Sequence, residues 1–293
     1  MSDFVKQNAS LVEFTTSDSW VVLSDIEMSI KKKIEAAGVP LKDWDIQINY
    51  GIKTGLNDAF IINEEKRNEI LSKCATTEEK ERTEQIIRPI LRGRDIERYG
   101  YNWKGLYLIN FHNGLPEKNL PALKIKDYPA IKKHLDNFLP QLTIRADQGD
   151  TPYNLRSCAY LDEFSKPKII YPNMTKYMPF LYDDKGFYTN QKCFIITGKY
   201  IAFLTLFLNS SLFKYCFRDS FPELLGGTRE LSKVFFDKIP IKQVEETHRY
   251  QSILADIQQE YSKEKEIQID EIIFDLYGLS SEERTRIGHI EIK

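Results

Sequence analysis

The chain has 293 residues, of which 42% are hydrophobic and 29% are charged, and its formal net charge is -2. This composition is ordinary for a folded protein of two domains, or of one domain with an appendage, and it excludes an intrinsically disordered chain. No apolar run is long enough to cross a bilayer, the first residues lack a secretory signal, and the four cysteines are widely separated, so we expect a protein of the reducing cytoplasm with no membrane contact.

The net charge hides a segregation along the chain. Residues 100–200 contain 14 lysines and arginines against 9 acidic residues, whereas residues 241–293 contain 7 against 12. A polyanion would therefore be attracted by the middle of the chain and repelled by its end. Segregation of this size also occurs in proteins that never bind nucleic acid, so it permits that function without proving it.

The first predicted element is a lead-in over residues 1–43. Ser24 can cap a helix through IEMSIKKKIEAAG, and Gly38 ends it. Two strands are predicted next, DIQINYG (residues 45–51) and AFIIN (residues 59–63), and we expect the glycine-containing loop GIKTGLND to join them as a hairpin. Residues 64–86 are charged and are predicted to be helical.

The segment RPILRGRDIERY carries four arginines: Arg88, Arg92, Arg94 and Arg98. Pro89 removes a backbone donor and Gly93 weakens a helical turn, so we predict a bent segment in place of a continuous helix. Its apolar side chains are expected to point inward. The arginines can then either contact DNA or form ion pairs, in which Arg94 or Arg98 binds Asp95 or Glu97.

Further strands and one helix are predicted up to residue 199. Residues 106–111 form a strand, and residues 128–139 form a helix with proline in its first turn. The polar segment RADQGDTPYNLR (residues 145–156) is expected to be an exposed loop. Several strand-like runs follow between residues 167 and 197, and residues 183–186 are expected to be a hairpin turn between two of them.

The pattern becomes helical after residue 199. Residues 200–219 are strongly apolar and predict a buried helix with a kink near Asn209; residues 252–263 and 270–277 predict two more helices. Ser280 with Glu283 forms a capping-box signature for a last short helix. The fold class is therefore predicted as α+β: a β-rich region with a mixed or antiparallel sheet, followed by a helical C-terminal region.

Catalytic motifs are missing. The sequence has no glycine-rich phosphate loop, no nucleophile elbow, and no histidine at a metal-ligand spacing from another histidine or a cysteine. The nearest candidate for a magnesium-dependent nuclease is the run Glu78, Glu79, Lys80 and Glu81, which equally fits a solvated helix face. We therefore predict no catalytic residue and no metal site. The polar loops of the middle region instead carry the side-chain types that bind phosphates and read base edges.

Six stretches then occur in a familiar order: WDIQINYGIKTGLNDAFII, IIRPILRGRDIERY, YPAIKKHL, YNLR with FSKPKIIYPN, LTLFLNSSL and IDEIIFDLYGLSSEE. Together they resemble the TaqI-like C-terminal specificity domain, from about Trp44 to Glu283. That domain is the target-recognition part of combined (type IIG-like) restriction-modification enzymes and of phage-exclusion methyltransferases that methylate adenine N6. The resemblance implies that residues 44–199 recognise DNA and that residues 200–293 form a helical region packed on them, with an acidic end.

The resemblance also accounts for the absent motifs. In that family the methyl-transfer motif and the S-adenosylmethionine loop lie on a preceding domain, and this sequence contains neither. We therefore expect the recognition half of a longer polypeptide, with residues 1–43 as the linker. No cofactor is expected in this chain, because the resemblance implies that S-adenosylmethionine binds to the missing methyltransferase domain. The expected partners are double-stranded DNA and that domain.

The expected DNA-contacting residues lie in six segments of the chain. Arg92 and Arg94 are the first expected contacts; Arg145 is predicted to read guanine, and Gln148 or Asn154 to read adenine. The complete expected set is Lys53, Thr54, Asn57, Arg92, Arg94, Arg145, Gln148, Tyr153, Asn154, Arg156, Lys176, Asn190, Gln191 and Arg229. Arg229 follows Gly226 and Gly227, and this glycine loop is expected to enter a helix whose amides accept a phosphate.

Two functions of other classes stay open on the sequence alone. One is a protein-interaction module whose acidic C-terminal helices dock a partner subunit. The other is a divergent magnesium-dependent nuclease that uses the acidic run at residues 78–81.

Overall fold

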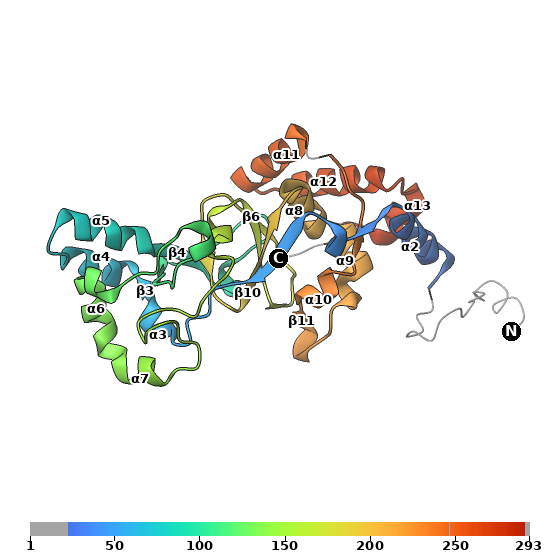
Figure 1. Ribbon diagram of the computed structural model, residues 1–293. Coiled ribbons are helices and arrows are strands. Elements are labelled where there is room, and N and C mark those ends of the chain that lie inside the picture. Colours follow the sequence, from blue (N-terminus) through green and yellow to red (C-terminus); the bar gives the residue numbers. More distant parts are fainter. Residues whose placement is uncertain (1–22, 246, 291–293) are drawn as a thin grey trace, which may run out of the picture.

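The computed structural model describes residues 23–245 and 247–290. The described molecule is elongated: α4–α7 lie at one end, α2 and the C-terminal helices lie at the other, and sheets lie between them (Figure 1). The α+β class and the helical C-terminal region are confirmed. The first 22 residues of the expected lead-in lie outside the described residues.

The central sheet has the strand order β2-β10-β6-β8 and is antiparallel throughout. Its strands are β2 (Ile46–Tyr50), β6 (Lys168–Pro172), β8 (Leu181–Asp183) and β10 (Cys193–Gly198). Successive side chains of a strand point to opposite faces. β6 and β10 are buried on both faces, as expected for strands whose sequences are nearly continuous apolar runs.

The two faces of this sheet supply two separate hydrophobic clusters. Tyr171 and Phe194 belong to the cluster on the side of the C-terminal helices, and their rings stack at 5.4 Å. Ile170 and Ile195 belong to the cluster at the other end of the molecule. The central sheet is therefore a wall shared by both cores.

The second sheet has the order β3-β5-β4-β9 and is mixed, because β4 pairs with β9 in parallel and with β5 antiparallel. Its strands are β3 (Ile61–Asn63), β4 (Ile87–Leu91), β5 (Leu106–Ile109) and β9 (Tyr188–Thr189). The surrounding helices are α3 (Asn57–Phe60), α4 (Glu64–Ser72), α5 (Thr77–Ile86), α6 (Pro129–Leu135) and α7 (Leu139–Ile144).

Two predicted hairpins are wrong. The strands expected to flank GIKTGLND belong to different sheets, β2 to the central one and β3 to the second one. Likewise, residues 183–186 connect β8 of the central sheet to β9 of the second sheet. Each turn crosses from the central sheet to the second sheet, so the two strands that it joins do not pair with each other.

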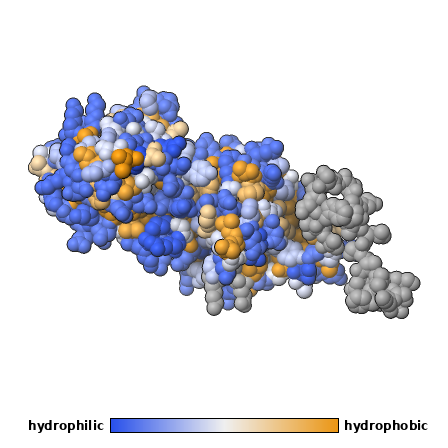
Figure 2. Space-filling view, turned by 90° about the horizontal axis from the view of Figure 1, so that it is seen from below, coloured by the Kyte–Doolittle hydropathy of each residue, from blue (hydrophilic) through white to orange (hydrophobic). Residues whose placement is uncertain are grey.

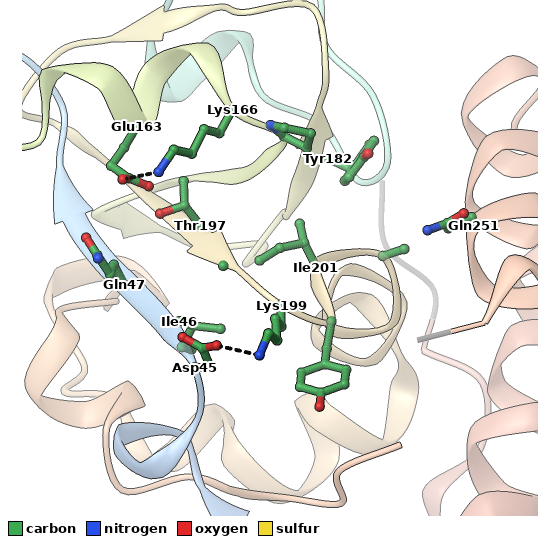
Figure 3. Close-up of a pocket in the computed structure, with 14 residues that line it drawn as sticks. Asp45, Ile46, Gln47, Glu163, Lys166, Tyr182, Thr197, Lys199, Ile201 and Gln251 are labelled. Atoms are coloured by element: carbon green, nitrogen blue, oxygen red, sulfur yellow. Dashed lines mark hydrogen bonds and ion pairs between the residues drawn. The ribbon is translucent and has the colours of Figure 1, made fainter. Parts of the chain in front are cut away.

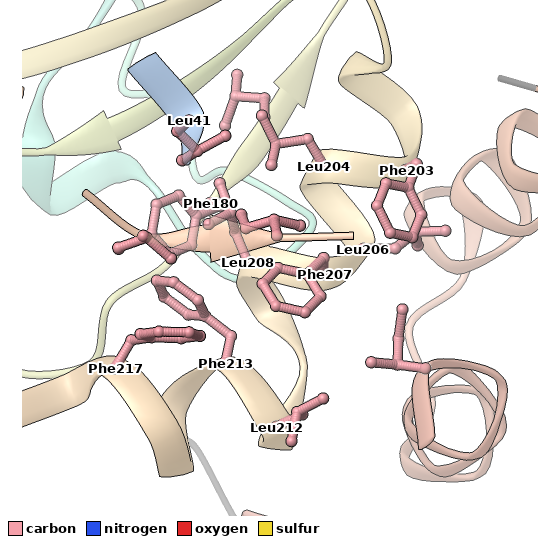
Figure 4. Packing of buried hydrophobic residues seen from close by; sticks show 14 of the residues in the cluster. Leu41, Phe180, Phe203, Leu204, Leu206, Phe207, Leu208, Leu212, Phe213 and Phe217 are labelled. Carbon is pink, nitrogen blue, oxygen red and sulfur yellow. The ribbon is translucent and has the colours of Figure 1, made fainter. Parts of the chain in front are cut away.

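The C-terminal helices form the larger core with α2 (Asp25–Ala37). They are α8 (Ile201–Asn209), α9 (Ser211–Phe217), α10 (Lys233–Phe236), α11 (His248–Gln259), α12 (Lys263–Leu276) and α13 (Ser281–Ile287). Phenylalanine and leucine side chains of α8 and α9 interlock with Leu41 and Phe180 (Figure 4). Two short two-residue pairings complete the strands: β1 (Val39–Pro40) with β12 (Pro240–Ile241), and β7 (Met174–Thr175) with β11 (Arg229–Glu230).

Local signals placed several of these helices correctly. Ser24 caps α2 and Ser280 caps α13, each in a full capping box. The expected kink near Asn209 is the break between α8 and α9, where Ser210 is extended and caps α9. α11 begins and ends about four residues earlier than predicted, and α12 begins seven residues earlier. Within the described residues, no helix is long and apolar enough to cross a membrane.

Lys214 on α9 should make stability depend on pH. Its side chain is buried, its Nζ has no hydrogen-bond partner within the described chain, and burial lowers its pKa from 10.5 to about 6. Between about pH 6 and 10 the unfolded chain holds this proton and the folded chain does not, so the free energy of unfolding should rise with pH.

Lys214→Met is expected to stabilise the protein at neutral pH and to flatten that rise, because methionine keeps the packing and carries no charge. Urea denaturation at several pH values measures both effects. An identical pH dependence in the two proteins would contradict the assignment.

Candidate nucleic-acid interface

One end of the central sheet gathers segments that are far apart in the sequence. β10 runs antiparallel to β2 and β6, so the ends of β2 and β6 meet the beginning of β10; Phe194 pairs with Tyr50, and Cys193 pairs with Pro172. The Gly51 amide donates to the Cys193 carbonyl oxygen at 2.9 Å. Loops that leave these strands therefore open onto the same end of the sheet.

Gly51 is required where β2 leaves this sheet end. A Cβ at this position would lie 2.1 Å from the carbonyl oxygen of Asn190, which is backbone and cannot rotate away. Gly51→Ala is therefore expected to lower the free energy of unfolding by about 1–3 kcal/mol through overpacking. Urea denaturation measures this. Gly100→Ala is the control, because its Cβ would meet only the Arg98 carbonyl oxygen at 3.9 Å; an equal loss in both variants would contradict the prediction.

The bent arginine segment packs beside the same sheet end. A 3-10 turn, Gly93–Asp95, follows β4, and a Cβ on Gly93 would lie 3.1 Å from the Cβ of Pro172. The predicted bend is confirmed, and Ile87, Ile90, Leu91 and Ile96 are buried as expected.

The structure divides the arginines of this segment between two roles. Arg92 donates to both carboxylate oxygens of Asp95, at 2.8 and 2.9 Å, and Arg98 binds Glu266 at 2.6 Å. The sequence expected ion pairs within the segment for Arg94 or Arg98; the pair to Asp95 comes from Arg92. Arg94 is exposed and makes no hydrogen bond or ion pair within the described chain.

Exposed cationic and aromatic side chains surround this sheet end. The Gln191 amide donates to the Ile52 carbonyl oxygen at 3.1 Å, and the Asn173 amide donates to that of Lys192 at 2.8 Å, so the three loops are joined by backbone hydrogen bonds. We call the accessible side chains of these three loops and of the adjoining 3-10 turn the sheet-end surface. Its members are Tyr50, Lys53, Arg94, Met174, Lys176, Tyr177, Gln191 and Lys192.

The loop at residues 145–156 does not present its arginine to solvent. Arg145 is 8% exposed, and its guanidinium donates to the carbonyl oxygens of Thr54, Pro152 and Asn154. It also lies over the Phe60 ring, and burial lowers its pKa to about 10. The expected guanine contact by Arg145 is therefore corrected: the side chain holds two loops together, because carbonyl groups accept hydrogen bonds from both of its terminal nitrogens.

Other members of the expected set are also occupied inside the fold. Asn154 is buried and donates to the His112 and Leu123 carbonyl oxygens, at 3.2 and 3.3 Å. Thr54 is buried and donates to Asn57 at 2.6 Å. Asn190 is 8% exposed, and its side chain accepts from the Lys192 amide. These residues shape the loops and present little surface to a ligand.

Arg229 is a second correction. It is 7% exposed, and it donates to the Phe221 carbonyl oxygen and binds Asp219 and Glu223 at 2.8 and 2.9 Å. The glycine loop before it leads into β11 and not into a helix. Arg229 therefore stabilises the turn between Asp219 and Glu223 through these contacts. The residues that follow the glycine loop form a strand in place of the expected helix N-terminus.

Three further members of the set remain accessible in part. Gln148 donates to the Thr143 carbonyl oxygen at 2.8 Å, and Tyr153 donates to Asp136 at 2.7 Å. Arg156 is exposed and binds Asp147 at 2.8 Å. Lys53 and Arg156 line a small cavity of about 200 Å³ together with Tyr50, which places this loop next to the sheet-end surface.

Reasoning from the sequence did not single out Tyr50, Met174 or Tyr177, whereas Lys192 belongs to the stretch at residues 189–192 that was a second candidate for base readout. Tyr50 is 47% exposed at the end of β2, and Tyr177 is 52% exposed between β7 and β8. The only signal for them was their position at strand ends next to predicted loops. Figure 2 shows that hydrophobic residues reach one face of the molecule in small separate groups among hydrophilic ones.

Another cavity, of about 600 Å³, lies at the opposite end of the central sheet (Figure 3). Two ion pairs border it, Asp45 with Lys199 at 2.9 Å and Glu163 with Lys166 at 2.6 Å. None of the residues expected to contact DNA lines it. Across the described chain, no group of three or more histidine, cysteine, aspartate or glutamate side chains is placed to hold a metal ion.

The described chain is thus an α+β scaffold with accessible cations and amides on the loops of one sheet end. The family model of the TaqI-like C-terminal specificity domain matches residues 88–241, which is more than half of the chain, and the chain belongs to this family. The resemblance seen in the sequence is thereby confirmed.

Two solved structures have a similar fold. The type IIG restriction endonuclease BpuSI matches with a TM-score of 0.52 and 14% identity, over 87% of this chain and 33% of that one. The type IIL restriction-modification enzyme MmeI, solved in complex with DNA, matches with a TM-score of 0.53 and 11% identity, over 84% of this chain and 35% of that one. The chain thus spans about a third of the length of each enzyme.

Proposed function

We propose that this chain is the sequence-specific double-stranded DNA recognition part of a restriction-modification protein, or of a related adenine-N6 methyltransferase. The observation that supports this most directly is the sheet-end surface. Lys53, Arg94, Lys176 and Lys192 are cations on loops that share one end of a rigid sheet. Membership of a specificity-domain family supports the same function.

The chemistry of the surface suits two kinds of DNA contact. The lysines would bind phosphates and fix the register, since such contacts carry no sequence information. Arg94 and Gln191 have the donor and acceptor geometry to read guanine and adenine edges, and each good bidentate contact discriminates by about 1–3 kcal/mol. Tyr50 and Tyr177 would pack against sugars or bases.

The methyl transfer itself would belong to another part of the polypeptide. We propose that a methyltransferase domain that binds S-adenosylmethionine supplies that chemistry and that the target adenine is extruded into it. The chain described here would hold the duplex and select the site.

Neither of the other functions has comparable support. In the acidic run at residues 78–81, Glu79 is buried and accepts from the Ala75 and Ala130 amides at 2.9 and 3.1 Å. The Glu79 carboxylate, one of those that the nuclease hypothesis requires, is therefore occupied by backbone hydrogen bonds inside the fold. The C-terminal helices expected to dock a partner bury their apolar residues in the chain's own core.

Selection from a random pool of duplexes tests the proposal. The chain is expected to enrich one short sequence and to bind it with an affinity that falls steeply as salt rises, because counterions are released from the phosphates. Binding that enriches no sequence would contradict specific recognition, and no duplex binding at low salt would contradict DNA recognition altogether.

A further inference from the structure

A cavity of about 760 Å³ lies next to the sheet-end surface and has no role in the proposed function so far. Three segments form it: the arginine segment from Gly93 to Gly100, the residues from Met174 to Pro179, and the end of α11 with the residues that follow. Its volume is within the range of roughly 300–1,000 Å³ that is common for small-molecule sites. Arg94 belongs both to the cavity and to the sheet-end surface.

The walls of the cavity carry large side chains that are left in water. Tyr177 and Tyr261 are 52% and 51% exposed, and Met174 is 55% exposed. All three line the cavity. Aromatic rings exposed in a concave site offer flat surfaces on which a planar ring stacks.

The polar groups of the cavity include donors without partners. Arg94 has no hydrogen-bond or ion-pair partner within the described chain. The Arg98 side chain is 8% exposed, and although its terminal nitrogens contact Glu266 and Asn209, its buried Nε has no partner there. Glu97 is exposed and adds an acceptor. A ligand that complements this set has an anionic group, a ring acceptor and an amino donor.

The frame of the cavity is held in place independently of any ligand. Gln258 on α11 donates to the carbonyl oxygens of Tyr99 and Tyr182, at 3.1 and 2.8 Å. Tyr99 has a φ of 60°, an uncommon angle for a side-chain-bearing residue, and its amide donates to the Phe180 carbonyl oxygen. These bonds tie α11 to the arginine segment, so the cavity is preformed.

We propose that this cavity binds a nucleotide, with its base against Tyr177 and Tyr261 and its phosphate at Arg94. The exposed carboxylate of Glu97 favours a base with an exocyclic amino group, which adenine, cytosine and guanine carry and thymine lacks. The inference rests on the proposed DNA recognition only for the source of the ligand, which is either a nucleotide extruded from the bound duplex or a free mononucleotide. An extruded nucleotide would be a different one from the target adenine, which enters the methyltransferase domain. Arg94 would then bind its phosphate in place of a guanine edge.

The test uses the full chain and Tyr261, because this side chain belongs to the cavity and not to the sheet-end surface. The probes are dAMP and two duplexes, one fully paired and one with a single unpaired 2-aminopurine. Binding of the unpaired base is expected to tighten by about tenfold relative to the paired duplex, with 2-aminopurine fluorescence quenched by stacking. Tyr261→Ala should abolish this gain, and Tyr261→Phe should retain it because the ring is kept.

The outcomes separate the two sources. A gain for the unpaired duplex that depends on Tyr261 supports an extruded nucleotide, whereas dAMP binding in calorimetry that depends on Tyr261 supports a free one. If neither probe responds to Tyr261→Ala while circular dichroism shows a folded variant, the nucleotide site is overturned. Failure of the proposed function is recognised separately, because the wild-type chain would then not bind the paired duplex.

Discussion

Replacement of Lys53, Lys176 and Lys192 together by alanine is expected to weaken duplex binding for all sequences alike. Each lysine is accessible on a loop at one end of the central sheet, where it can neutralise one phosphate. The slope of the logarithm of the binding constant against the logarithm of salt should become shallower by roughly one per lysine, about three in all. Fluorescence anisotropy over a range of salt concentrations measures the slope.

The matched control removes the same charge elsewhere. Lys31, Lys32 and Arg249 are exposed on α2 and α11, outside the sheet-end surface. Their triple alanine variant changes the net charge equally and is expected to leave the slope nearly unchanged. Equal effects of both triple variants would show that binding depends only on net charge. They would contradict the assignment of the sheet-end surface as the DNA contact.

Replacement of Lys168 by methionine is expected to lower the free energy of unfolding more than any other substitution proposed here. Lys168 and Asp183 lie on neighbouring strands β6 and β8, are almost fully buried, and form an ion pair at 2.6 Å. Asp183 also accepts from the amides of Lys185 and Phe187, at 3.0 Å each, so its carboxylate orders the turn between the two sheets. Without the ammonium, a buried negative charge would lack compensation.

The expected cost is about 3–5 kcal/mol in the free energy of unfolding, measured by urea denaturation, because removal of one partner leaves the other charge buried. Lys199→Met is the matched control. That lysine binds Asp45 at 2.9 Å on the surface, where both side chains are mostly exposed, so the expected cost is at most about 1 kcal/mol. Similar losses in the free energy of unfolding for both variants would contradict the claim that burial of the Lys168–Asp183 pair causes the larger loss.

The sequence predicted local structure better than the pairing of strands. Caps, kinks and strand ends depend on neighbouring residues, and so Ser24, Ser210 and Ser280 begin helices in the structure. The two predicted hairpins failed because short turns with glycine also occur between sheets. Which strands pair depends on which core their side chains enter, and that is decided by residues distant in the sequence.

The candidate site shows the same division. Residue types on loops predicted several of the accessible cations. They did not distinguish Arg94, which makes no hydrogen bond or ion pair within the described chain, from Arg145, which is buried. The terminal nitrogens of Arg145 donate to carbonyl groups of two loops, one of them 91 residues away. A guanidinium suits a phosphate and a cluster of carbonyls equally well, so only the packing of the two loops assigns it.

The shared wall between the two cores has a consequence for hybrid proteins. A hybrid that joined residues 23–199 of this chain to the helices of a distant relative would present Tyr171 and Phe194 to side chains that did not evolve to fit them. Such hybrids should aggregate or melt early, whereas substitutions at the accessible positions 53, 94, 176, 177, 191 and 192 leave the shared sheet and its loops intact. Under the proposed function, new DNA targets are therefore best sought at these positions.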